Sequence, residues 1–148
     1  MKPHVPSADD ARIALHEHLV EKATSARLRH GLLIDADAIL RILNDRETVR
    51  YPVEVAFDAR PLEPGEFAYP RPLGERPSDG FRLCLHPWFE PMPEVWPLLI
   101  AYHLPTINYG EIAGPAEAEL FGAALLGIER EEYYNALCEL ADSIPGEN

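Results

Sequence analysis

The sequence predicts an α+β fold: a small antiparallel sheet of about three strands, packed by an N-terminal helix pair and a C-terminal helical hairpin. The first observation behind this is the placement of proline. Twelve of the fifteen prolines lie from Pro52 to Pro115, and none lies between Ser7 and Tyr51. Proline fixes φ and lacks a backbone N–H, so the middle of the chain favours short extended pieces. The second is helical spacing of apolar residues on both sides of this middle part.

We interpret residues 1–148 as a single domain with three parts. Residues 7–45 are helical, residues 49–110 are β-rich and proline-rich, and residues 114–144 form the helical hairpin. A chain of this length buries roughly 70% of its unfolded surface. The composition, 47% hydrophobic and 26% charged, is typical of a soluble globular chain and not of a disordered one.

Two helices are predicted in the N-terminal part. Ser7 is a good N-cap for the first helix, and Gly31 is placed to end it. Asp35 can cap the second helix. The residues expected to be buried recur at helical spacing: Leu15, Leu19, Ala23 and Ala26 in the first helix, and Ile39, Leu40, Ile42 and Leu43 in the second.

Three strands are predicted in the middle part. Apolar and polar residues alternate over 51–58 and again over 81–86, and a shorter candidate spans 66–69. Pro52 indicates that the first strand starts unpaired or at an edge, because proline cannot donate to a neighbouring strand. Residues 94–104 fit both a helix and a buried strand, and the spacing of their apolar residues favours a helix.

The C-terminal part predicts two helices. Gly114 and Pro115 begin the first one, because proline is well tolerated in a first helical turn. Gly127 ends it, and Pro145 follows the second helix. The expected buried residues are Leu120, Phe121, Ala124 and Leu125 in the first helix, and Tyr133, Leu137, Leu140, Ala141 and Ile144 in the second.

The net charge of −12 is unevenly distributed, and residues 111–148 alone carry −8. Binding nucleic acid requires Lys and Arg to neutralise phosphates, and the chain has no basic tract, so we predict no nucleic-acid partner. The longest apolar run is far too short to span a membrane, and the first ten residues lack the apolar core of an export signal. We therefore expect a cytoplasmic protein.

The segment 87–96 is the candidate binding surface. It places Trp88, Phe89, Met92 and Trp96 among three prolines, and a fourth, Pro97, directly follows the segment. Aromatic residues and Met are enriched at interface cores, and proline lowers the entropy lost on binding. We predict a cytoplasmic interaction or accessory protein that binds a protein partner through this segment and the acidic hairpin. In two alternatives, the segment covers the protein's own core, or a homo-oligomer buries these rings.

The alternative function is a small metal-dependent enzyme. His86, Glu90 and His103 carry the imidazole and carboxylate groups that Zn²⁺ and other divalent transition metals use as ligands. No motif spacing relates the three residues, so the hypothesis requires the fold to bring them to one edge of the sheet. A lone histidine without such a motif is more often structural.

Overall fold

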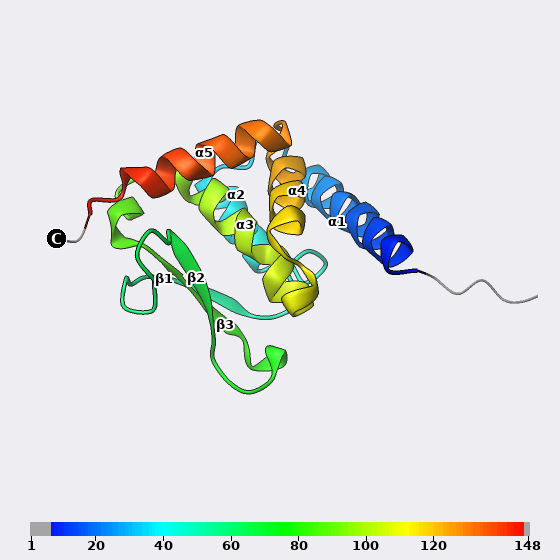
Figure 1. The fold of residues 1–148 in the computed structure, drawn as a ribbon, viewed down its shortest axis with the longest axis horizontal. Helices are drawn as coiled ribbons and strands as arrows, with labels where there is room; N and C mark the ends of the chain where they lie inside the picture. Colours follow the sequence, from blue (N-terminus) through cyan, green and yellow to red (C-terminus); the bar gives the residue numbers. More distant parts are fainter. Residues whose placement is uncertain (1–6, 147–148) are drawn as a thin grey trace, which may run out of the picture.

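The computed structural model describes residues 7–146 (Figure 1). Residues 1–6 and 147–148 of the predicted domain lie outside this range. An α+β fold is confirmed, with five α-helices and three strands in the described part. The helices are α1 (Ala8–His30), α2 (Ala36–Leu43), α3 (Trp96–Tyr109), α4 (Pro115–Leu126) and α5 (Arg130–Ser143), and the strands are β1 (Val53–Phe57), β2 (Ala68–Pro72) and β3 (Phe81–Leu85).

The sheet is mixed, so the prediction of a purely antiparallel sheet is wrong. Its strand order is β1-β3-β2, with β1 parallel and β2 antiparallel to β3. The most deeply buried strand, β3, lies in the centre, and its residues Leu83, Cys84 and Leu85 are buried. Pro52 directly precedes β1, and β2 contains Pro70 and Pro72. Edge strands tolerate proline because one side of their backbone has no partner strand.

Strand β2 lies further along the chain than the predicted 66–69, because it accommodates Pro70 and Pro72. The backbone N–H of Leu73, just after β2, points towards β3 and donates to the Gly80 carbonyl. Since N–H groups alternate sides along a strand, the nitrogens of Pro70 and Pro72 point away from β3. Neither proline removes a hydrogen bond from the sheet.

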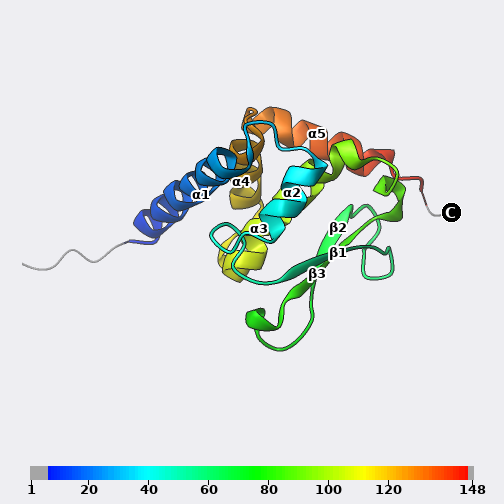
Figure 2. The same cartoon turned by 180° about the vertical axis from the view of Figure 1, so that it is seen from behind.

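All the helices lie on one side of the sheet (Figures 1 and 2). Helix α3 contacts β2 and β3 on one side and α4 and α5 on the other, so it forms the centre of the core. Of residues 94–104, which the sequence left ambiguous, 96–104 belong to α3 and the two before them to a 3-10 turn. Pro97 lies in the first turn of α3, as expected. The Tyr133 hydroxyl of α5 donates to the Leu98 carbonyl over 2.6 Å and ties α5 to α3.

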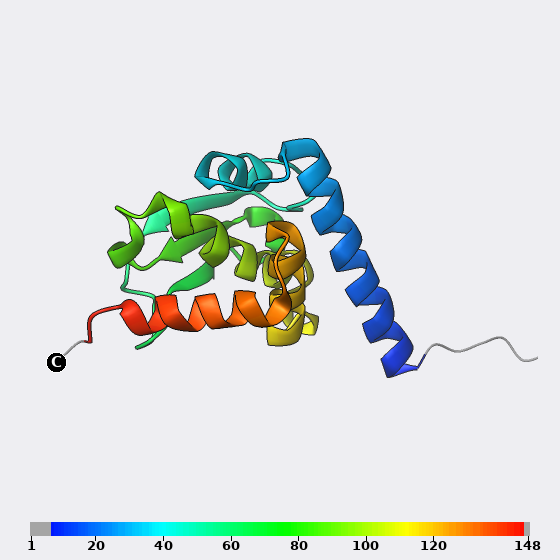
Figure 3. The same ribbon diagram turned by 90° about the horizontal axis from the view of Figure 1, so that it is seen from above.

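Helix α1 packs mainly on α4, and its N-terminal half projects from the rest of the protein (Figure 3). The predicted caps are present: Ser7 accepts from the Asp10 backbone N–H, and Asp35 accepts from that of Ala38. Gly31 ends α1 with a φ of 107°, which favours glycine. No helix in residues 7–146 is both long and apolar enough to cross a membrane.

A polar hub fixes the end of α1 to the turn after α2. The Asp45 carboxylate accepts hydrogen bonds from Arg29 at 2.8 Å and from the His30 ring at 2.9 Å. Burial by itself would raise the pKa of Asp45, but these hydrogen bonds outweigh it and lower the pKa to about 2. Asp45 is therefore ionised at neutral pH and holds the two elements together.

Candidate functional site

The proline-rich segment 87–96 folds over the protein's own core and leaves one large ring exposed. Phe89 is fully buried, and Met92 is partly buried against the core. The Trp96 indole N–H donates to the Phe89 carbonyl over 2.7 Å. The ring centres of Trp96 and Phe57 are 5.3 Å apart. Of the four predicted binding residues, Trp88 is the one whose side chain remains available, with 39% of the residue exposed.

The predicted metal ligands His86, Glu90 and His103 are not brought together. No group of three or more His, Cys, Asp or Glu residues in the described part of the chain could hold a metal ion. The His103 ring lies against those of Phe67 and Tyr102, and its Nε2 atom is buried without a hydrogen-bond partner. Burial lowers the pKa of His103 to about 4, so this ring is neutral at pH 7.

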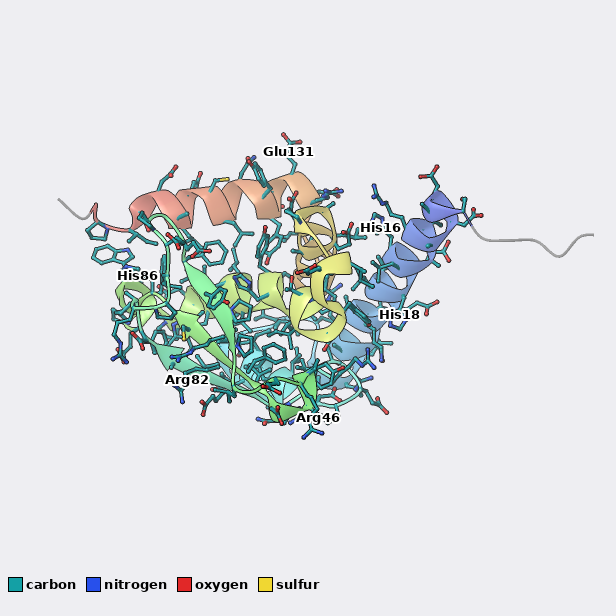
Figure 4. The ribbon with its side chains drawn as sticks, turned by 60° about the horizontal axis from the view of Figure 1, so that its bottom comes forward. His16, His18, Arg46, Arg82, His86 and Glu131 are labelled. Atoms are coloured by element: carbon teal, nitrogen blue, oxygen red, sulfur yellow. The ribbon has the colours of Figure 1, made fainter. Side chains whose placement is uncertain are left out.

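His86 instead contributes to a cleft of about 520 Å³, which we call the acidic cleft. The cleft forms where the end of β3, the loop after β1 and the C-terminal end of α5 meet, and Figure 4 labels His86 in this part of the molecule. The Nδ1 atom of His86 accepts the Trp88 backbone N–H over 3.0 Å, which orients the ring. The lining residues are Ala59, Leu62, Glu63, Pro64, Gly65, Glu66, His86, Ala141, Asp142, Ile144, Pro145 and Gly146.

The acidic cleft combines negative charge with apolar surface. Glu63, Glu66 and Asp142 contribute carboxylates, Leu62 and Ile144 contribute aliphatic side chains, and the lining contains neither Lys nor Arg. The Glu66 carboxylate accepts the Glu63 backbone N–H over 2.6 Å, and the Glu66 backbone N–H donates to the Glu63 carbonyl over 3.0 Å, so two hydrogen bonds close the turn that carries both residues. Carboxylates gathered in a concave surface reinforce one another's field and attract cationic groups.

The nearest cation in the sequence does not neutralise this charge. Arg60 belongs to the loop that lines the cleft, but its side chain pairs with Asp58 at 2.8 Å and is not part of the lining. The hydrogen bonds from Arg60 are the main cause that lowers the pKa of Asp58 to about 2. The two charges therefore balance each other outside the lining of the cleft.

The acidic cleft lies next to the predicted aromatic segment and includes a residue of the acidic hairpin. His86 directly precedes the segment 87–96, and Asp142 belongs to the acidic hairpin. Sequence reasoning missed the loop 59–66, which contributes Glu63 and Glu66. The available signal was the pair Pro64-Gly65 between two glutamates, since such a pair predicts a turn that places its neighbours on the surface.

Comparisons with protein-family models, with curated proteins and with solved structures gave no match.

Proposed function

We propose that this chain is a cytoplasmic interaction protein whose acidic cleft binds a basic segment of a protein partner. The observation that carries the proposal is the lining of the cleft: three carboxylates and two large aliphatic side chains, with no Lys or Arg among them. This combination complements a peptide segment that presents Lys or Arg, because opposite charges across an interface favour encounter and select the partner.

The mixed chemistry of the cleft suits long basic side chains in particular. Lys and Arg bury their aliphatic stems on apolar surface while their charged ends reach polar groups. Leu62 and Ile144 supply such a surface, and Glu63, Glu66 and Asp142 supply the opposite charge. The exposed Trp88 follows His86 by two positions and offers an additional aromatic contact for the same partner.

The test is a binding titration with a fluorescently labelled peptide of alternating Lys and Leu, followed by anisotropy. The triple variant Glu63→Gln, Glu66→Gln, Asp142→Asn removes the charge of the cleft, and Gln at position 66 keeps an acceptor for the loop. The matched control is Glu131→Gln, Glu132→Gln, Glu139→Gln, which removes the same charge from exposed positions of α5 that do not line the cleft.

The cleft variant should bind the peptide at least about tenfold more weakly than the control variant, since a charged hydrogen bond contributes about 1.5–3 kcal/mol. Added salt should weaken binding to the wild-type chain, because exposed charges are screened. Equal losses in the two triple variants would show that the peptide responds only to net charge and would contradict a specific site. Equally strong binding of a Glu-Leu peptide would do the same.

A further inference from the structure

A second cleft, separate from the acidic cleft, surrounds Arg50. It has a volume of about 610 Å³ and shares no lining residue with the acidic cleft. It lies where α3 ends, β1 and β3 begin and β2 ends (Figure 1). The rings of Tyr51, Tyr69, Phe81 and Tyr109 line it, and we call it the tyrosine cleft.

The Arg50 guanidinium is held between two of these rings. Its central carbon lies 5.5 Å from the ring centre of Tyr51 and 6.0 Å from that of Tyr109. Both distances are within the range in which a cation is attracted to the face of an aromatic ring. The tyrosines therefore restrict the position of the positive charge in the cleft without neutralising it.

Asn108 fixes the backbone from which Arg50 projects. This buried residue at the end of α3 accepts the Arg50 backbone N–H over 2.9 Å with its side-chain oxygen. Its side-chain nitrogen donates to the Thr48 carbonyl over 2.7 Å, and its own carbonyl accepts one N–H of the Arg50 guanidinium over 3.3 Å. Two hydrogen bonds from Arg50 to this buried residue, which is itself fixed to Thr48 by a third, hold Arg50 in place. This lowers the entropy that a ligand would have to overcome.

The held guanidinium has no carboxylate partner within residues 7–146, although six pairs between an arginine and a carboxylate occur elsewhere in that range. A guanidinium has five N–H donors in a planar fork that matches a carboxylate, and the Asn108 carbonyl takes one of them. Glu111 also lines the cleft without pairing with Arg50.

We propose that the tyrosine cleft binds a small organic anion with a flat aromatic body. Its carboxylate pairs with Arg50, and its body stacks on the tyrosine and phenylalanine rings. The volume of the cleft falls within the range of small-molecule sites. A hydrophobic neutral molecule would leave the cation unpaired, and a cationic one would be repelled by it, so the anion is the class that satisfies both the charge and the rings.

The experiment titrates the full chain with naphthoate, the neutral naphthylmethanol and the cationic naphthylmethylamine by calorimetry. Naphthoate should bind the wild-type chain more tightly than either analogue. Arg50→Gln should weaken naphthoate binding by about tenfold, which corresponds to the loss of a charged hydrogen bond. Arg41→Gln, which removes the same charge from an exposed position of α2, should leave the affinity unchanged.

Two further variants make the outcome independent of any folding defect in Arg50→Gln. Arg50→Lys keeps the charge but loses the planar fork, so its affinity should fall between those of the wild-type chain and Arg50→Gln. Glu111→Gln leaves Arg50 untouched and should raise the affinity by removing a repelling charge. Equal binding of naphthoate and naphthylmethanol, no binding of naphthoate, or equal losses in Arg50→Gln and Arg41→Gln would each overturn the proposal. None of these results bears on the acidic cleft.

Discussion

Acidification from pH 6.5 to about 4 should destabilise this protein through the buried ring of His103. The Nε2 atom of His103 is buried and has no hydrogen-bond partner. In the folded chain, a proton on this nitrogen would therefore contact neither solvent nor a hydrogen-bond acceptor. Burial accordingly lowers the pKa of His103 from 6.5 to about 4. The unfolded chain, in which the ring is solvated, binds that proton more readily.

The size and sign of the effect follow from this difference. Above pH 6.5 the ring is neutral in both states, and it contributes no pH dependence. Between pH 6.5 and about 4 the unfolded state binds the proton and the folded state does not, so the free energy of unfolding falls as the pH falls. The loss is about 1.4 kcal/mol per pH unit, or about 3 kcal/mol over the whole window.

Urea unfolding followed by circular dichroism at several pH values across this window would measure the effect. His103→Leu should remove most of the dependence, while changing the stability at pH 7 little, because Nε2 has no hydrogen bond to lose. The control His18→Gln removes an exposed histidine and should keep the full dependence. The other histidines are present in both His103→Leu and the wild-type chain, so their contributions to the pH dependence cancel when the two are compared.

Two results would refute this reasoning. If His103→Leu and the wild-type chain lost stability in parallel between pH 6.5 and 4, another group would be responsible. If nuclear magnetic resonance gave the folded His103 ring a pKa close to 6.5, the ring would be solvated, and the buried position of Nε2 would be wrong.

The remaining predictions concern packing and the polar hub. Phe89→Ala should lower the free energy of unfolding by about 3–5 kcal/mol and Trp88→Ala by less than about 1 kcal/mol, because Phe89 is buried and Trp88 is exposed. Comparable losses of the two variants in urea unfolding would contradict this difference in burial. Gly122→Ala should lower the free energy of unfolding by about 1–3 kcal/mol, since the added Cβ would overlap the Tyr133 ring. An unchanged stability in urea unfolding would contradict this close packing. Asp45→Asn should lower the free energy of unfolding by about 1–3 kcal/mol at pH 7. This difference in stability from the wild-type chain should shrink as the pH falls from 3.8 towards 2, because the wild-type carboxylate is then protonated as well. A difference that does not change with pH would contradict the charged hub.

Local sequence patterns predict most of the helical part of this fold. Ser7, Asp35 and Gly127 act where the sequence predicts caps and stops, because a cap depends on residues within one turn of the helix end. The buried stripes also follow from spacing, and Leu19 and Leu137 are buried as their positions predict. These features are decided by neighbours in the sequence and can be read from it.

The candidate sites were predictable only in part. The aromatic segment 87–96 was recognisable, but whether a ring such as Phe89 or Trp88 faces the core depends on what covers it, and that is a property of distant elements. Likewise, Arg50 and Asn108 are 58 positions apart, and no local pattern relates them. The two glutamates of the loop 59–66 became part of a site because α5 ends beside them.

By itself, the sequence determined the α+β class, the caps of α1 and α2, the end of α4 and the approximate positions of the three extended segments, because each depends on spacing and on residues a few positions apart. The tertiary structure alone decided that β3 pairs with both other strands, that β1 runs parallel to it, and that His86 meets α5 and not His103. The physical reason is that alternation along a strand is the same for parallel and antiparallel pairing. The choice between them depends on how well the assembled apolar faces are buried, and this energy belongs to the whole fold.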